Sequence, residues 1–451
     1  MISHKIKDGI VGNINIPADK SISHRSIIIP SISMGISEIN NLLMSDDVMH
    51  TLNAFKTLGV KIEKSNDKIL IYGKGLHSLK KPNKSIYLGN SGTSARLLTG
   101  LLASQTFETI LEGDHSLSSR PMARIMEPLK LMGAEFENTS GTLPLKIIGK
   151  NLNKSTIEID IPSAQIKSGL ILAALNTEGV SQIVEKNITR DHTENMLQAF
   201  GADINLEKNN NQTSIFIKGK QELKSNNINI PSDLSSSAFF IIAALINKGS
   251  KIYLNNININ PSRDGILKAL KKMGAKISIK NKRTVSGEVV ADLEVQYSDL
   301  VGCELDAEMA KFMIDEYPIL SIAAAFAKGT SIFKGLTELK VKESDRLELI
   351  RLNLVNCGCD CQVVNDDLIV KPSDNYLPIN NKIRTDFDHR IAMSFAVMGS
   401  KVGNVIIEDA ESINTSFPNF IEKFNSAGGN ILWKKLLLLM DPQDQEKRKY
   451  L

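Results

Sequence analysis

The chain has 451 residues, 42% of them hydrophobic and 23% charged, which is typical of a globular protein with two or more domains. A net charge of +4, from 54 Lys and Arg against 50 Asp and Glu, is too balanced for a protein that coats nucleic acid, so any preference for anions must be local. The N-terminus "MISHKIKDGIVG" lacks the apolar region of a signal peptide, and no run approaches the roughly 20 apolar residues of a membrane span, so we expect a cytoplasmic protein.

The first predicted strand is the alternating stretch from Gly9 to Pro17, and Pro17 ends it. The helix predicted next carries Lys20, Ser21 and Arg25 at its start, with Ser21 and Arg25 spaced to share a face. Solvation at the surface is the structural alternative to an anion-binding role for these cations.

This helix is the first of six helix-length runs of small and apolar residues, each apolar nearly all round, as expected of helices buried on every side. The runs are Ser21–Ser33, Thr93–Ser104, Ser163–Leu175, Ser235–Leu245, Tyr317–Ala327 and Arg390–Gly399.

A short strand predicted at Ser85–Leu88 is followed by the turn "GNSG", which begins the second run. A Gly/Ser-rich turn that opens a helix leaves free backbone N–H groups at the positive end of the helix dipole, which suits phosphate or carboxylate. Arg96, one turn into this helix, adds charge. The alternative is a tight turn without a ligand.

A second motif alternates with the buried runs: an amphipathic helix, a glycine and then a strand, as in "TLGVKIE" and "LMGAEFE". Glycine suits the left-handed position that ends a helix. The glycines are Gly59, Gly133, Gly201, Gly274, Gly358 and Gly428. The chain therefore consists of six copies of one α/β unit, which favours two halves of three units.

Arginines recur where the amphipathic helices begin. Ser and Asp caps explain the acidic residues of these segments, but a cation at a helix N-terminus opposes the dipole unless an anion joins it. Arg120, Arg190 and Arg346 are therefore candidates for binding, whereas Arg263 has no further support and is interpreted as structural. Asp315, ahead of Pro318, is either an N-cap or a functional acid.

The four cysteines are Cys303, Cys357, Cys359 and Cys361, and the last three form C-G-C-D-C. Alternation along a strand would place those three on one face. A metal site needs a fourth ligand and usually wider spacing, so free thiols are favoured over metal.

Seven cations begin helices or flank them: Lys20, Arg25, Arg120, Arg190, Lys342, Arg346 and Arg390. If the six units close around a cleft, these cations converge from both halves, a density that fits two phosphorylated or carboxylated ligands bound together. Asp315 and Glu343 are the leading acids for proton transfer in that field.

Seven motifs occur in order between about Gly9 and Gly429: "PADKSISHR", "LGNSGTSARLL", "SAQIKSGLILAAL", "TRDHTENML", "DEYPIL", "KESDR" and "DHRIAM". Together they resemble the 5-enolpyruvylshikimate-3-phosphate synthase family, 3-phosphoshikimate 1-carboxyvinyltransferases of the shikimate pathway, and most closely the bacterial subgroup with "SAQ" and "TRDHTE".

The resemblance implies an α/β fold of two inside-out domains, each of three βαβαββ units, with the active site in the cleft between them. One domain would comprise residues 1–18 and 232–451 and the other 19–231, and residues 434–451 would be a frayed tail. It implies a monomer that binds shikimate 3-phosphate and phosphoenolpyruvate, with no metal or organic cofactor and no nucleic acid or membrane partner.

Matched motif by motif, the resemblance assigns two overlapping sites. Shikimate 3-phosphate would contact Lys20, Ser21, Arg25, Ser163, Ala164, Gln165, Arg190, Asp315 and Lys342. Phosphoenolpyruvate would contact Lys20, Gly92, Arg120, Gln165, Arg346 and Arg390.

The implied reaction is addition–elimination through a tetrahedral intermediate. Asp315 would act as base toward the 5-hydroxyl, Glu343 would protonate C3 and later take a proton back, and Lys20 would assist the departing phosphate. The surrounding cations should keep both carboxylates ionised, so Glu343 must gain its proton through burial on closure.

Two positions bear on activity and inhibition. Thr415 stands where some relatives carry a lysine, but the subgroup resembled also lacks that lysine, so we do not interpret the change as loss of activity. Glyphosate competes for the phosphoenolpyruvate site in this family, and Gly92, where some tolerant enzymes carry alanine, predicts sensitivity.

Three rival functions fit less well. The transferase acting on UDP-N-acetylglucosamine uses a cysteine in the loop that here reads "GDHSLSSRP", and no cysteine precedes Gly302. A catalytically dead relative should have lost Asp315, Glu343 or an arginine. An RNA-modifying enzyme calls for aromatic stacking near its cations, and aromatic residues are only 5% of the chain.

Overall fold

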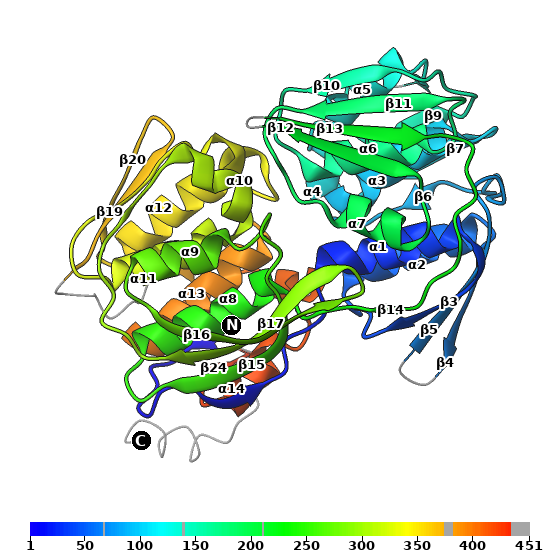
Figure 1. The fold of residues 1–451 in the computed structure, drawn as a ribbon. Helices are drawn as coiled ribbons and strands as arrows, with labels where there is room; N and C mark the ends of the chain where they lie inside the picture. The colour runs from blue at the N-terminus through cyan, green and yellow to red at the C-terminus, as the bar shows by residue number, and fades with distance from the viewer. Residues whose placement is uncertain (66–67, 138–139, 210–211, 374–381, 434–451) are drawn as a thin grey trace.

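The computed structural model describes residues 1–65, 68–137, 140–209, 212–373 and 382–433 (Figure 1). The tail predicted to be frayed, residues 434–451, lies outside these ranges. No helix in the described ranges is long and apolar enough to cross a membrane.

Six helices are buried on nearly all sides, as the six apolar runs predict, and their ends fall within a few residues of the expected ones. In α8 all thirteen residues are buried. These helices are α1 (Lys20–Ser31), α3 (Gly92–Ala103), α6 (Ala164–Ala174), α8 (Leu234–Ile246), α11 (Tyr317–Ala325) and α13 (His389–Val402).

Six amphipathic helices alternate with them: α2 (Asp46–Thr57), α5 (Ala123–Leu131), α7 (His192–Ala199), α9 (Gly265–Lys272), α12 (Arg346–Asn356) and α14 (Phe420–Ser426). The glycine after each has a positive φ, between 80° and 108°, which confirms the predicted left-handed ends. Each glycine leads into a strand: β4 (Lys61–Ser65), β8 (Glu135–Glu137), β12 (Ile204–Asn209), β16 (Lys276–Val285), β20 (Asp360–Val364) or β24 (Ile431–Leu432).

Each unit contributes to one of six four-stranded sheets, in which the first two strands are parallel and the others antiparallel. Three sheets are built from consecutive strands. Their orders are β6 (Ile86–Tyr87), β7 (Glu108–Glu112), β9 (Leu145–Ile148), β8; β10 (Thr156–Ile159), β11 (Val180–Glu185), β13 (Gln212–Lys218), β12; and β18 (Glu304–Leu305), β19 (Ser331–Phe333), β21 (Asp367–Lys371), β20.

Each of the other three sheets includes a strand from a distant part of the chain. Their orders are β14 (Ile228–Asn229), β3 (Met34–Asn40), β5 (Lys68–Lys74), β4; β2 (Val11–Ile14), β15 (Lys251–Asn258), β17 (Glu288–Gln296), β16; and β22 (Lys382–Ile383), β23 (Val405–Ile407), β1 (Ile2–Ser3), β24. Strand β2 is shorter than the predicted Gly9–Pro17 because the chain leaves the sheet after Ile14 to enter α1.

The hydrophobic residues form two separate cores, which define two lobes (Figure 1). The core of the first lobe runs from Ala18 to Ile230, and that of the second combines Met1–Ile16 with Leu234–Ile431. The chain passes between the lobes twice, and the two passages touch where Ala18 and Ser232 form an antiparallel bridge. In each lobe the buried helices occupy the middle and the sheets lie outside, so apolar residues surround each helix.

Close helix packing is clearest between α3 and α6. A Cβ on Gly100 would lie 1.9 Å from the carbonyl oxygen of Gly169, so the two backbones touch only because both residues lack side chains. This contact brings the starts of α3 and α6 together at the cleft.

One prediction about the cysteines is wrong. Cys357 follows the last turn of α12 and Cys359 lies in the connection after it, so only Cys361 belongs to β20 and the three do not alternate along one strand. All four cysteines are buried free thiols. The helix end at Gly358, which the glycine motif predicts, is what places Cys357 before the strand.

A candidate active site between the two lobes

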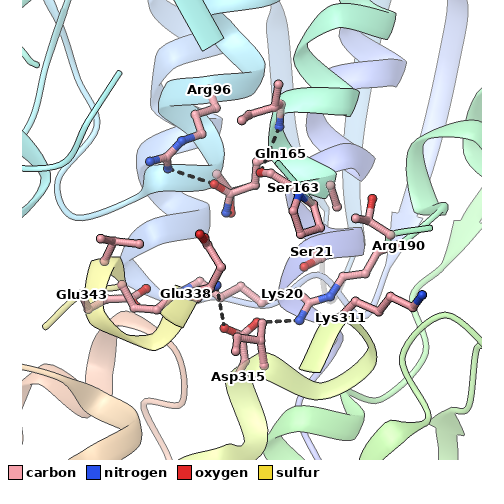
Figure 2. Close-up of a pocket in the computed structure, with 18 of the residues that line it drawn as sticks. Lys20, Ser21, Arg96, Ser163, Gln165, Arg190, Lys311, Asp315, Glu338 and Glu343 are labelled. Atoms are coloured by element: carbon pink, nitrogen blue, oxygen red, sulfur yellow. Dashed lines mark hydrogen bonds and ion pairs between the residues drawn. The ribbon is translucent and has the colours of Figure 1, made fainter. Parts of the chain in front are cut away.

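A cavity of about 180 Å³ opens between the lobes, and side chains from both line it (Figure 2). Ten of these side chains are cationic and four are carboxylates, so the cavity is strongly positive in a chain of almost balanced charge. The cations are Lys20, Arg25, Arg96, Arg120, Arg124, Arg190, Arg263, Lys311, Lys342 and Arg390, and the carboxylates are Asp233, Asp315, Glu338 and Glu343.

The start of α1 presents Lys20, Ser21 and Arg25 to the cavity. Asp19 caps the helix by accepting a hydrogen bond from the Ile22 N–H at 2.9 Å. Arg25 is buried, and its guanidinium donates to the backbone oxygen of Ser21 at 2.9 Å, which confirms that the two residues share a face.

Lys20 forms an ion pair with Asp47 at 2.5 Å. Asp47 lies in the first turn of α2, whose N-cap residue, Ser45, makes no side-chain cap. Burial raises the pKa of Asp47, and the neighbouring charge of Lys20 opposes that rise. Asp47 therefore holds Lys20, which lines the cavity, from behind.

The predicted Gly/Ser turn starts α3, with Ser91 accepting from the Ser94 N–H at 3.2 Å. Because α3 and α6 pack so closely, Arg96 of α3 reaches Gln165 at the start of α6, donating to its Oε1 at 2.9 Å (Figure 2). The Gln165 amide donates in turn to Thr93 at 3.0 Å, so the side chain is held from both ends.

Gly92 does not line the cavity itself but lies just behind two of its cations. A Cβ at this position would be 2.8 Å from Nη1 of Arg96 and 3.1 Å from Nη1 of Arg120. Arg120 also donates to Asn90 and to Ser116, which fixes it beside the turn. The absence of a side chain at Gly92 leaves room for both guanidinium groups.

Asp315 lies at the centre of the cations (Figure 2). Its carboxylate is 2.5 Å from Arg190, 3.3 Å from Arg346 and 3.5 Å from Lys342, while Arg390 donates to its backbone oxygen at 3.1 Å. Burial raises the pKa of Asp315, but the charges of these four cations together hold it well below its ordinary value. The N-cap alternative is excluded, since Glu316 is the residue that precedes α11 and no side chain caps it.

Glu343, the second acid, pairs with Arg346 at 2.6 Å and lies 3.9 Å from Arg120. Burial raises its pKa, but the two arginines, first Arg346 and then Arg120, hold it well below its ordinary value. Both directions agree with the prediction that the surrounding cations favour the ionised form of these acids. Arg346 is buried behind the cavity wall, where Asp388 accepts from its Nε at 2.7 Å.

Twelve of the fourteen predicted site residues line the cavity, and only Gly92 and Arg346 stand directly behind its wall. The twelve are Lys20, Ser21, Arg25, Arg120, Ser163, Ala164, Gln165, Arg190, Asp315, Lys342, Glu343 and Arg390.

Two further residues, Arg124 and Lys311, line the cavity although they were not predicted as site residues. Arg124 of α5 pairs with Glu338 at 3.0 Å and so bridges the lobes. Lys311 lies in a segment without any motif. For Arg124, the signal that existed was its place one turn after the "SSRP" motif.

Arg263 also reaches the cavity, yet its partners agree with a structural role. It pairs with Asp19 at 3.3 Å and with Glu316 at 3.5 Å, and it donates to Ser235. These residues surround the two passages of the chain between the lobes, so Arg263 balances buried acids there.

Thr415, the position that departs from some relatives, lies behind the cavity. Its hydroxyl is 3.4 Å from Nδ1 of His389, which lines the cavity. Burial lowers the pKa of His389 well below its ordinary value, and the nearby charge of Lys20 adds to that effect. Within the described ranges no cluster of three or more His, Cys, Asp or Glu side chains could hold a metal ion.

Comparison with known proteins identifies the family. Residues 5–424 match the family model described as EPSP synthase (3-phosphoshikimate 1-carboxyvinyltransferase). The 3-phosphoshikimate 1-carboxyvinyltransferase of Vesicomyosocius okutanii is 43% identical over 426 residues, covering 94% of this chain and 97% of the relative. That of Magnetococcus marinus is 44% identical over 421 residues, covering 92% and 94%.

A solved EPSP synthase structure from Acinetobacter baumannii superposes with a TM-score of 0.83 at 41% identity, covering 95% of this chain and 98% of that one. This similarity confirms the expected fold of two inside-out α/β domains. By sequence, by fold and by the motifs that converge on the cavity, the chain belongs to the EPSP synthase (3-phosphoshikimate 1-carboxyvinyltransferase) family.

Proposed function

We propose that the cavity between the lobes is where this chain transfers the 1-carboxyvinyl group of phosphoenolpyruvate to the 5-hydroxyl of shikimate 3-phosphate. Membership of the family makes the chain a transferase of the shikimate pathway, which serves aromatic amino-acid biosynthesis. The observation that supports this location is the convergence of ten cations from both lobes around Asp315 and Glu343.

The two substrates would contact overlapping sets of residues in the cavity. We assign shikimate 3-phosphate to Lys20, Ser21, Arg25, Ser163, Ala164, Gln165, Arg190, Asp315 and Lys342, and phosphoenolpyruvate to Lys20, Gly92, Arg120, Gln165, Arg346 and Arg390. Bidentate guanidinium groups suit phosphate and carboxylate oxygens, and this number of cations offsets the several negative charges of the two substrates.

In the addition step, the 5-hydroxyl oxygen bonds to C2 of phosphoenolpyruvate while Asp315 accepts its proton and Glu343 gives a proton to C3. In the elimination step, C3 returns a proton to Glu343, the C2–O bond to phosphate breaks, and Lys20 stabilises the departing phosphate. Asp315 is ionised as a base must be, because Lys342 and Arg190 lower its pKa.

Glu343 must be protonated before it acts, although Arg346 and Arg120 lower its pKa in this structure. Those two arginines are among the proposed partners of phosphoenolpyruvate. A bound anion that shares their charge would remove the effect that lowers the pKa, so substrate binding and burial on closure together supply the protonated acid.

The lobes are proposed as the two domains, residues 19–231 and residues 1–18 with 232–451. Support comes from the two separate cores and from the paired passages at Ala18 and Ser232. We further propose a monomer, because one chain supplies the whole cavity lining, and a cytoplasmic enzyme, because its four cysteines are free thiols as in a reducing compartment.

The test is phosphate release with both substrates and with each omitted. Release that needs both, and that falls about 10²- to 10⁴-fold in Asp315→Asn, supports the proposal. Binding of both substrates without release would show that the cavity only binds them, and Thr415 would then be the first position to examine.

A further inference from the structure

A second set of buried polar contacts joins the two lobes outside the cavity. The β16–β17 hairpin of the second lobe reaches across to the first lobe, beside α1 and α7 (Figure 1). Its two-residue turn, Ser286 and Gly287, has φ values of 49° and 83°, the pattern of a tight type I′ hairpin turn. The Ser286 hydroxyl accepts a hydrogen bond from the Asn229 N–H of β14 at 3.0 Å.

The hairpin is bent by irregularities in its register. Pairing shifts between Lys280 and Arg283 in β16 and between Leu254 and Ile257 in β15. Asp292 of β17 holds both places, accepting from the Asn256 N–H at 2.8 Å and from the Asn281 amide at 2.9 Å. Such bulges turn a strand out of its sheet, which here aims the hairpin tip at α7.

At the tip, Glu288 meets the start of α7. The His192 imidazole donates from Nδ1 to Glu288 at 2.8 Å, and both side chains are at most 4% exposed. The other ring nitrogen, Nε2, is buried with no hydrogen-bond partner among the described residues, so Glu288 alone fixes the ring. A buried carboxylate is stable only when its oxygens are satisfied.

The remaining acceptors of this cluster are used as well. The Asn260 amide nitrogen lies 3.0 Å from Glu288 and 2.8 Å from Asp191, so it bridges a carboxylate of each lobe. The Asn258 amide donates to Glu288 at 3.4 Å, and the Ser262 hydroxyl donates to Asp191 at 3.3 Å.

The residues held in this way flank Arg190, which pairs with Asp315 in the cavity. On one side of Arg190, Thr189 is fixed within the first lobe, because Glu185 accepts from its N–H at 2.9 Å. On the other side, the Asn195 amide of the first lobe donates to Asp191 at 3.3 Å, and the second lobe adds the contacts of Asn260 with Asp191 and of Glu288 with His192. The segment after Arg190 is therefore held by both lobes, and the docked hairpin supplies the hydrogen bond to His192.

We propose that Glu288, the residue at the tip of this interlobe clasp, is a positioning residue that sets Arg190 for shikimate 3-phosphate when the lobes come together. The clasp comprises Asp191, His192, Asn258, Asn260, Ser262 and Glu288. Glu288 touches no substrate; it acts through His192 and Asn260 on the backbone that carries Arg190. This inference rests on the proposed role of Arg190 in binding that substrate.

The test compares Glu288→Ala with Thr284→Ala, an exposed position of the same hairpin outside the clasp. Glu288→Ala should raise the KM for shikimate 3-phosphate about three- to thirtyfold, the range of coupling through packed networks, and leave the KM for phosphoenolpyruvate within about twofold. Thr284→Ala should match the unaltered enzyme. Glu288→Gln, which keeps one acceptor oxygen, should fall between them.

Two further variants decide how Glu288 acts. If it acts through Arg190, adding Glu288→Ala to Arg190→Ala should not raise the KM for shikimate 3-phosphate beyond that of Arg190→Ala alone. An unfolded fraction lowers the apparent kcat but not KM, so poor folding cannot imitate the expected split.

The outcomes separate the two proposals. An unchanged KM in Glu288→Ala, an equal rise for both substrates, or additive effects in the double variant would overturn the clasp while Arg190→Ala still raised the KM. No effect of Arg190→Ala would overturn the assigned role of Arg190 and the clasp with it.

Discussion

Glu343 shows how one residue's protonation can depend on its substrate. Arg346 and Arg120 stabilise its ionised form, and both are proposed to bind the anionic substrate. If Glu343 is the proton donor, as proposed, these arginines favour its ionised form until the substrate shares their charge.

For Glu343→Gln we expect kcat to fall about 10²- to 10⁴-fold with the KM for phosphoenolpyruvate little changed. With substrate bound, the pKa of Glu343 rises from its lowered value, so the kcat of the unaltered enzyme should decline as pH increases through that raised pKa. Glu343→Gln should lack this decline. A pH–rate profile with the same shape in both proteins would argue against Glu343 as the acid.

Gly92 offers a test of the assigned phosphoenolpyruvate site. In Gly92→Ala the new methyl group must displace the ends of the Arg96 and Arg120 side chains, which lie within 3.1 Å of its position. We expect a higher KM for phosphoenolpyruvate and weaker inhibition by glyphosate, while the unaltered enzyme is inhibited near its KM for phosphoenolpyruvate. Steady-state inhibition assays measure both, and an inhibition constant far above that KM in the unaltered enzyme would contradict the prediction of sensitivity.

At the residue scale, the sequence predicts that a charged side chain lies near the start of a helix. It does not predict whether that side chain lines the cavity or lies behind its wall. Arg120, Arg190 and Arg346 all conflict with the dipole of a helix, and all three reach the site. Whether a side chain lines the cavity, as Arg190 does, or supports it from behind, as Arg346 does, depends on how the lobes meet. No local pattern carries that information, and for the same reason Arg124 and Lys311 were missed.

At the scale of helices, the contact between α3 and α6 links stability to the site. Gly100→Ala would place a methyl carbon 1.9 Å from the Gly169 carbonyl oxygen, so the helices must separate. We expect the free energy of unfolding to fall by about 1–3 kcal/mol, measured by denaturant titration. Gly92→Ala on the same helix is the control, since it meets only flexible side-chain ends; equal losses in the two variants would refute the packing argument.

The cysteines around the end of α12 should be inert in the folded protein. Burial raises the pKa of the Cys359 and Cys361 thiols to about 12, and it also raises the pKa of Cys303 and Cys357. Since the thiolate is the reactive form, a thiol-specific chromogenic reagent at pH 8 should label none of the four until denaturant is added. Rapid labelling of the native enzyme would show that this region opens.

Individual elements were predictable because their signals are local. Gly59 and its five counterparts mark helix ends through backbone geometry that other residues rarely adopt, and the apolar runs mark burial. The pairing of strands within a sheet was harder to predict from the sequence. The alternation of β2 predicts a strand, but nothing within it indicates that it pairs with β15, more than 200 residues later in the chain.

At the scale of the whole molecule, the buried ion cluster at the two passages between the lobes should contribute strongly to the free energy of unfolding. Burial raises the pKa of Asp19, but the charge of Arg263, together with the hydrogen bond from the Ile22 N–H and the charge of Arg190, leaves that pKa lowered. Arg263→Met would leave Asp19, Asp233 and Glu316 without their common cation, so the free energy of unfolding at pH 7 should fall by about 3–5 kcal/mol.

The deficit of Arg263→Met should shrink on acidification. A lowered pKa in the folded state stabilises the protein above the unfolded value of about 3.9, and that contribution is lost as pH falls through the folded pKa. Unfolding of both proteins at pH 7 and near pH 3, below the unfolded pKa, measures the change. Arg384→Met, which breaks an exposed pair with Asp386, is the control and should lose no more than about 1 kcal/mol.

The membership of β1 and β2 in the second lobe also orders events during synthesis on the ribosome. Residues 19–231 contain every strand of the first lobe, so that lobe can be completed once β14 emerges. Strands β1 and β2 are made first but find their partners last: β2 waits for β15, and β1 waits for β23 and β24 near residues 405–432. Because β1 is an inner strand of its sheet, the earliest residues of the chain join the structure last, and their removal would separate β24 from the rest of its sheet.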